Sequence, residues 1–271
     1  MPTFGSRGFQ IYYETHGGGD GLPLLLVMGM GGTCQGWLVL QVPEFSRDRK
    51  TIIFDNRGAG RSEDPGTPFT TRDMAEDTLA LLDELGIERA HVLGGFLGGM
   101  VAQELALAHP ERVQSLILAG TFACADAKRR LLLEVWQGMV EHGLPHELRI
   151  KNRLCWTLSD ATLELRDIVD AMWRFYLEDD AALEDKIFVR QAAACLAHDT
   201  RGRLGELRAP TLVVYGEQDL LAPHHLQREL AEAIPSARLV AIPGASHLVA
   251  VEMAPRFNRL VTRFAAEHDG S

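Results

Sequence analysis

Short apolar runs alternate with longer amphipathic runs along most of this chain, and this alternation limits the folds that are open to it. The runs that suit strands are residues 10–14, 24–27, 51–54, 91–93, 115–119, 211–215 and 238–242. Most are continuously apolar, which is typical of parallel strands covered on both faces. Helical patterns lie between them, for example at residues 72–85 and 97–109. The alternation therefore predicts βαβ units and a parallel sheet.

The alternation stops between residues 122 and 208, where the spacing of apolar residues is helical and no run suits a strand. A helical block inserted between two strands predicts a cap over one edge of the sheet. The expected division is therefore a core of residues 1–121 and 209–271 and a cap of residues 122–208. The aromatic residues of the cap include Trp156, Trp173, Phe175 and Tyr176. They either line a pocket or fill the interior of the cap, since large aromatic side chains dominate protein cores.

Composition excludes several classes of function. The chain has 271 residues, of which 46% are hydrophobic, and this suits one large α/β domain. A net charge of −10 argues against nucleic acid or anionic lipid as the main partner. No apolar run approaches the ~20 residues of a membrane helix, and the N-terminus lacks a signal-peptide profile. We expect no membrane partner and a cytoplasmic protein, whereas no pattern indicates the oligomeric state.

Neither a metal nor an organic cofactor is expected. The four cysteines form no C-x-x-C pair and no cluster with histidine. The glycine-rich loop at residues 29–34, GMGGTC, resembles a dinucleotide-binding fingerprint, but Cys34 stands where the third glycine belongs. This substitution argues against nucleotide binding.

Five motifs occur in a characteristic order. They are LLLVMGMGGTCQGW (24–37), FDNRGAGRS (54–62), HVLGGFLGGM (91–100), VVYGEQDLLAP (213–223) and IPGASHLVAVEMAP (242–255). In order and context the chain resembles the α/β-hydrolase fold family along nearly its whole length. The resemblance implies a mostly parallel eight-stranded sheet flanked by helices, with the helical cap inserted after the sixth strand.

The same resemblance implies a site at the carboxyl ends of the strands. Members of this family carry nucleophile, acid and histidine in that order, which here implies position 96, Asp219 and His247. The alternative is that Asp219 shapes a turn and His247 makes a local hydrogen bond. Backbone N–H groups of Met30 and Leu97 are the implied oxyanion donors. The expected pocket residues are Gly29, Gly95, Phe122, Trp156 and Trp173.

Phe96 departs from the family pattern, because it stands where a hydrolase has its nucleophilic serine. A phenyl ring cannot attack a carbonyl, so no acyl-enzyme can form at this position. The turn also forces its central residue into a strained backbone conformation, which costs about 1–3 kcal/mol.

Three functions remain open. The first is a non-hydrolytic enzyme, in which His247 or the substrate moves a proton next to an activating group while the N–H donors stabilise the charge. Phe96 at this position resembles the peptide aspartate epimerase of bottromycin maturation, which implies an isomerase acting on a modified peptide. The second is a catalytically inactive binding protein. The third is an esterase or lactonase for a small molecule, with its serine replaced.

Overall fold

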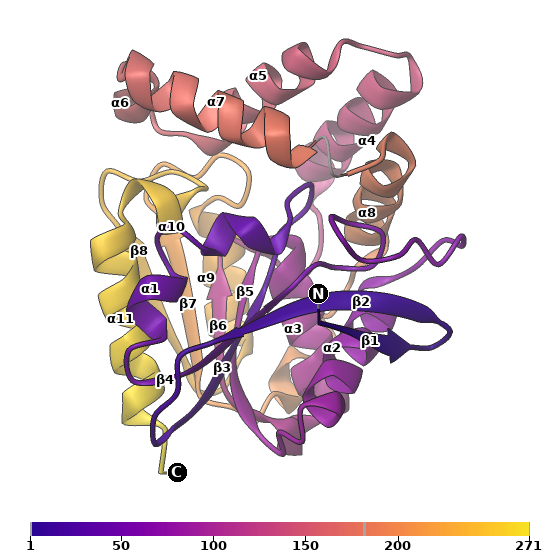
Figure 1. Ribbon diagram of the computed structural model, residues 1–271. Coiled ribbons are helices and arrows are strands. Elements are labelled where there is room, and N and C mark those ends of the chain that lie inside the picture. Colours follow the sequence, from indigo (N-terminus) through magenta and orange to yellow (C-terminus); the bar gives the residue numbers. More distant parts are fainter. Residues whose placement is uncertain (1, 181–182, 271) are drawn as a thin grey trace.

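An eight-stranded sheet forms the centre of the molecule (Figure 1). The computed structural model describes residues 2–180 and 183–270. The strands are β1 (Thr3–Ser6), β2 (Phe9–His16), β3 (Gly21–Val27), β4 (Arg49–Phe54), β5 (Ala90–Gly95), β6 (Val113–Ala119), β7 (Thr211–Gly216) and β8 (Ala237–Ile242). Their order in the sheet is β1-β2-β4-β3-β5-β6-β7-β8. Strand β2 is antiparallel to β1 and β4, and the other pairs are parallel, as expected.

Helices cover both faces of the sheet. The core helices are α1 (Val42–Phe45), α2 (Thr71–Glu84), α3 (Leu97–Ala108), α9 (His224–Ala233), α10 (Val249–Glu252) and α11 (Ala254–Glu267). Short 3-10 helices are η1 (Cys34–Trp37), η2 (Pro110–Arg112) and η3 (Leu204–Glu206). Helices α2, α3 and α9 share one apolar cluster with the sheet, and α1 and α11 share another.

Strand β3 shows how the sequence produces these two layers. Leu25 and Val27 belong to the cluster on the α3 side, while Leu24 and Leu26 belong to the cluster on the α11 side. All four side chains are fully buried. Because successive side chains of a strand point to opposite faces, a continuous apolar run is what a strand between two helical layers requires.

All seven predicted strand runs are strands, but the residue pattern missed β1. This four-residue edge strand, TFGS, buries only Phe4 and Ser6 and contains a glycine. So short a segment carries too little alternation to be distinguished from a loop. The eighth strand was expected only from the family resemblance.

Five helices lie between β6 and β7 and cover the upper edge of the sheet in Figure 1. They are α4 (Ala127–Glu141), α5 (His146–Thr157), α6 (Asp160–Leu163), α7 (Arg166–Asp180) and α8 (Asp185–Ala197). An isolated bridge between Cys124 and Asp199 joins the two chain segments at the base of this cap. The predicted domain boundaries at residues 122 and 208 stay predictions.

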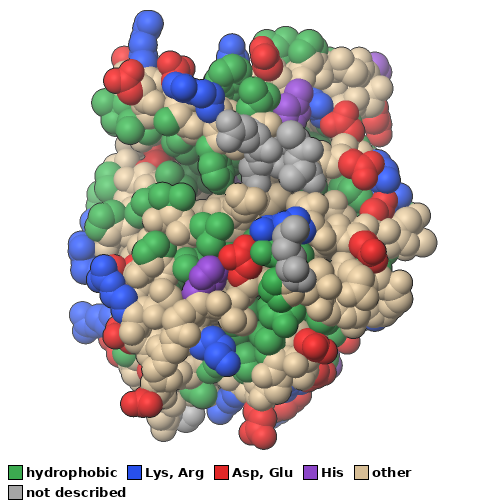
Figure 2. Space-filling model, viewed as in Figure 1, with side chains coloured by type: hydrophobic (Ala, Val, Ile, Leu, Met, Phe, Trp, Pro, Cys, Tyr) green, Lys and Arg blue, Asp and Glu red, His purple; other side chains and the backbone are tan. Residues whose placement is uncertain are grey.

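Charged side chains of both signs are interspersed on the face shown in Figure 2. Within residues 2–180 and 183–270, no helix is both long and apolar enough to cross a membrane. The same part of the chain holds no group of three or more His, Cys, Asp or Glu residues suited to a metal ion.

Candidate active site

The turn between β5 and α3 holds Phe96 in a rare backbone conformation. Its φ and ψ angles are 45° and −107°, and in the described part of the chain only one other non-glycine residue, Arg7, has a positive φ. Two hydrogen bonds hold this turn in place. One is made with β6 and the other with the segment that follows β6. The N–H of Phe96 donates to the Ala119 carbonyl at 3.0 Å, and Thr121 Oγ1 donates to the Phe96 carbonyl at 2.7 Å. Strain of this kind persists only where the surroundings over-determine the conformation.

Two glycines allow the turn to be this tight. A Cβ atom at position 94 would lie 2.2 Å from the carbonyl oxygen of Gly98. A Cβ atom at position 98 would lie 2.1 Å from the carbonyl oxygen of Val27. Both contacts are with backbone, which cannot move aside as a side chain can, so the sequence G-x-x-x-G is required by the close approach of β5, α3 and β3.

The Phe96 side chain is buried, with 6% of its surface exposed. Its ring makes edge contacts with two other rings, Phe122 at a centroid distance of 5.5 Å and His247 at 5.3 Å. The interplanar angles of 79° and 83° are the T-shaped geometry that aromatic pairs favour. The ring of Phe96 therefore packs directly against the candidate base.

His247, which is partly buried, and buried Asp219 form a pair beside this ring. His247 Nδ1 lies 3.0 Å from Asp219 Oδ2. Asp219 Oδ1 accepts the N–H groups of Leu221 and Ala222 at 2.8 and 2.7 Å. An ionised carboxylate only accepts hydrogen bonds, so the hydrogen of the neutral imidazole resides on Nδ1 and Nε2 keeps its lone pair. The pair can take up a proton at Nε2.

The loop after β3 lies against the turn. A Cβ atom at position 29 would be 3.1 Å from the Gly95 carbonyl oxygen and 3.7 Å from Cβ of Phe96. Met30 follows in this loop, and Leu97 is the first residue of α3. Among the described residues, neither N–H donates a hydrogen bond. Both remain candidates for stabilising negative charge on a ligand oxygen.

The predicted pocket residues do not all come together. Gly29, Gly95 and fully buried Phe122 lie around Phe96. Trp156 lies in the cap, partly buried, with Lys128 Nζ 5.6 Å from its ring centroid. Trp173 packs with Leu248 in a separate apolar cluster of α5 and α7. The structure therefore favours a role for Trp173 in the interior of the cap.

Sequence reasoning missed two contributors to the site. Gly120, which directly follows β6, has a φ of 53°, and a Cβ atom there would be 3.2 Å from His247 Nδ1. Asp55 Oδ1 accepts the N–H of Cys34 at 2.8 Å and so holds the loop after β3. Neither role has a local signal, since each depends on segments that are distant in sequence.

The sulfur of Cys34 is not an alternative nucleophile. Cys34 is fully buried, and Arg61 donates to its Sγ at 3.2 Å. Burial, reinforced by the nearby charge of Asp55, raises the pKa of this thiol far above its usual range. The thiolate is the nucleophilic form, so this cysteine is inert at neutral pH.

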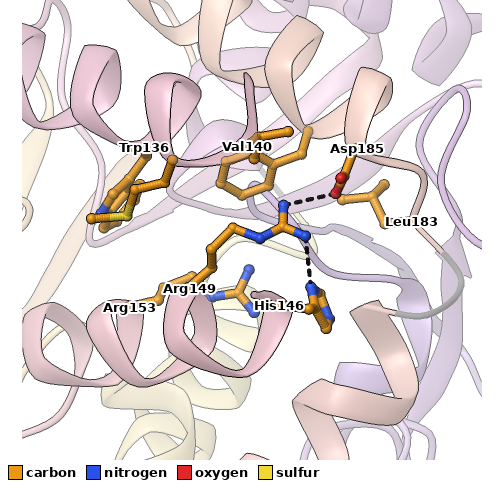
Figure 3. Close-up of a pocket in the computed structure, with 9 residues that line it drawn as sticks. Trp136, Val140, His146, Arg149, Arg153, Leu183 and Asp185 are labelled. Carbon is orange, nitrogen blue, oxygen red and sulfur yellow. Dashed lines mark hydrogen bonds and ion pairs between the residues drawn. The ribbon is translucent and has the colours of Figure 1, made fainter. Parts of the chain in front are cut away.

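A cavity lies within the cap, between α4, α5 and α8 (Figure 3). Apolar side chains line one part of it, including Trp136 and Phe188. Arg149 crosses it and donates to Asp185 Oδ1 at 2.7 Å and to His146 Nδ1 at 3.2 Å. Phe188 also lies against Gly31 of the loop after β3, 3.4 Å from a Cβ atom built there. The cavity and the loop therefore share a wall.

The fold and site together define a hydrolase-type α/β protein with a histidine–carboxylate pair and a phenylalanine at the tip of the turn. A family model described as alpha/beta hydrolase fold matches residues 23–253. The chain belongs to this family, as its motifs indicated.

Relatives of nearly equal length extend the comparison. The chain is 31% identical to a putative carbamate hydrolase, RutD, of Azorhizobium caulinodans, over 99% of this chain and 100% of the relative. It is 32% identical to a putative non-heme bromoperoxidase, BpoC, of Mycobacterium tuberculosis, over 94% and 97% of the two chains.

Solved structures are also similar. A hydrolase of Pseudomonas aeruginosa matches with a TM-score of 0.88 and 29% identity, over 97% of each chain. An enol-lactonase of Burkholderia xenovorans matches with a TM-score of 0.82 and 27% identity, over 98% of this chain and 100% of that one.

Proposed function

We propose that this chain carries the site of an esterase- or lactonase-type hydrolase whose nucleophilic serine has been replaced by Phe96. In its present form it binds a small carbonyl compound and forms no acyl-enzyme at position 96. The observation that carries this proposal is the turn itself. A nucleophile at this position needs a strained turn of this kind, and here two hydrogen bonds and close glycine contacts hold it. Only the side chain of Phe96 does not suit the role.

Two further observations support it. The His247 ring, which bonds to Asp219 through Nδ1, packs against the Phe96 ring at a centroid distance of 5.3 Å, so the candidate base adjoins position 96. The relatives named above include a putative carbamate hydrolase and an enol-lactonase, both names for cleavage of a carbonyl compound.

Restoring the hydroxyl tests the proposal. Phe96→Ser is expected to hydrolyse 4-nitrophenyl acetate and butyrate and to accumulate an acyl adduct on the introduced serine, visible as an added mass. Phe96→Ala is the matched control, because it opens the same space without supplying a nucleophile. Equal rates for the two variants, or no hydrolysis by either folded variant, would contradict the proposal.

A second candidate is proton abstraction at an activated α-carbon, the reaction of a peptide aspartate epimerase. The retained basic Nε2 of His247, together with an apolar ring that displaces water, favours it. The names of the relatives favour hydrolysis instead.

Heavy water separates the two candidates. Under proton abstraction, the unaltered chain incubated with an aspartate-containing peptide in deuterium oxide incorporates deuterium at an α-carbon, and His247→Ala slows this if the protein supplies the base. Absence of deuterium from the peptide excludes the second candidate for that substrate and leaves the first unaffected.

A further inference from the structure

One helix of the cap contacts both loops that border the candidate site. Ile187 and Gln191 lie one turn apart on α8 and face the core. Ile187 Cδ1 lies 2.6 Å from a Cβ atom built on Gly58, in the loop after β4. Gln191 Oε1 accepts the N–H of Gly31, in the loop after β3, at 2.8 Å. Since Gly31 adjoins Met30, this helix holds the segment that carries a candidate oxyanion donor.

The amide of Gln191 is only half satisfied. A backbone N–H can only donate, so the end of the amide that faces Gly31 is the oxygen, and the orientation of the group is fixed. The nitrogen at the other end, Nε2, is buried and has no acceptor among the residues that the structure describes. The whole residue has 0% of its surface exposed.

A fully buried donor without an acceptor is uncommon, because it loses its hydrogen bonds to water and gains nothing in return. The other glutamine of the cap, Gln137, differs in this respect. Gln137 on α4 donates through its Nε2 to the carbonyl oxygen of Val189 on α8 at 3.1 Å. Arg149 Nε and Trp173 Nε1 in the cap also lack an acceptor among the described residues, but both of these residues are only partly buried, whereas Gln191 is fully buried.

The position of Gln191 suggests what satisfies it. Phe188, three residues earlier on α8, lines the cap cavity and lies against Gly31. Gln191 thus lies on the helix that joins the cavity wall to the loop after β3, which carries Met30 and is called the oxyanion loop below. The amide of Gln191 is linked to this loop through Gly31, the residue next to Met30.

We propose that Gln191 Nε2 donates a hydrogen bond to a second acceptor oxygen of the substrate, while its Oε1 holds the oxyanion loop through Gly31. The substrate class is then an ester or lactone that bears a further ether, carbonyl or carboxylate oxygen beyond the reacting carbonyl. This inference deepens the proposed function and rests on it.

The test compares two esters of equal length in the Phe96→Ser background. 4-Nitrophenyl pentanoate has no acceptor in its acyl chain, and 4-nitrophenyl 3-methoxypropanoate has one ether oxygen. The measured quantity is the ratio of kcat/KM for the ether ester to that for the alkyl ester. Gln191→Glu keeps an acceptor for Gly31 but removes the donor, and Gln191→Met removes both.

We expect both Gln191 variants to lower this ratio about tenfold, mainly through KM of the ether ester. Only Gln191→Met should also lower kcat for both esters, because only it releases Gly31. The matched control, Gln137→Met, removes an amide whose donor is already bonded, and it should leave the ratio unchanged. Unfolding in urea checks that each variant is folded.

An unchanged ratio in both folded Gln191 variants overturns the inference and would mean that water alone satisfies Nε2. If Phe96→Ser hydrolyses neither ester, the proposed function fails, and binding then tests the inference separately. In the unaltered chain, 3-methoxypropanamide should bind more tightly than pentanamide by calorimetry, and this preference should disappear in Gln191→Glu. No preference in the unaltered chain overturns the inference.

Discussion

The two halves of the candidate site touch one another, yet they are built differently. In the Asp219–His247 half, each carboxylate oxygen accepts a hydrogen bond and neither residue has a strained backbone. In the half formed by the turn, the backbone is strained and the side chain at its tip is a hydrocarbon that only packs. The hydrogen bonds and close glycine contacts that hold the turn involve its backbone and not the side chain of position 96, so we expect the turn to persist when that side chain is changed. Each half can therefore be tested separately.

The largest effect is expected when the Asp219–His247 half is disrupted. In the Phe96→Ser background, His247→Ala should lower kcat/KM for 4-nitrophenyl butyrate by at least about 10³-fold, because the serine then lacks its base. His225→Ala, which alters an exposed histidine paired with Asp126, is the control and should have no effect. Retention of a tenth or more of the activity by His247→Ala would show that the two halves do not act together.

The next largest effect is a loss of stability when the turn is disrupted. Gly98→Ala should destabilise the protein by about 3 kcal/mol or more, since its Cβ atom would lie 2.1 Å from a backbone oxygen. The control is Gly95→Ala, whose Cβ atom would meet only the Trp37 ring, at 3.8 Å. Urea unfolding should place this control within about 1 kcal/mol of the unaltered chain. Similar losses in both variants would mean that backbone contact does not determine the turn.

Much of the fold could be predicted from the sequence because its signals are local. Continuous apolar runs such as residues 24–27 identify strands that are covered on both faces. The short edge strand Thr3–Ser6 escaped because half of its side chains face solvent and only four residues carry the pattern.

The candidate site was only partly predictable. Phe96, Asp219 and His247 follow strands within family motifs, so their positions were expected, and the structure brings them together. Gln191 was not expected. Its role depends on a contact with Gly31 across 160 residues of sequence, and its helical surroundings resemble any other part of the cap.

A second histidine, His198, offers a comparison with His247 of the Asp219–His247 half. His198, just beyond α8, bonds to the hydroxyl of Thr71 at 2.9 Å and, in the described part of the chain, to no carboxylate. Burial lowers its pKa from 6.5 to about 4, against smaller opposing effects of Glu104 and Asp199 and a reinforcing one of Arg203. Below pH 6.5 His198 is therefore protonated in the unfolded chain but stays neutral in the folded chain. The free energy of unfolding consequently decreases as the pH falls towards 4.

At pH 5 this loss amounts to about 2 kcal/mol relative to pH 7.5, by the linkage of pKa and stability. Urea unfolding should show that His198→Asn loses about 2 kcal/mol less stability than the unaltered chain between pH 7.5 and pH 5. Parallel pH profiles for the two proteins would show that His198 is not held neutral by burial.

The smallest effect separates the strain of the turn from the packing of its tip. Replacing Phe96 by Ala or Gly removes the same ring contacts, and each variant should lose about 3–5 kcal/mol. At a φ of 45°, however, glycine avoids the steric conflict that alanine keeps, so Phe96→Gly should be the more stable of the two by about 1 kcal/mol. At Ala102, inside α3, the order reverses, because glycine in a helix interior is less stable than alanine. If alanine were also the better residue at position 96, the turn would hold no strain, and the ring alone would account for the stability of this half.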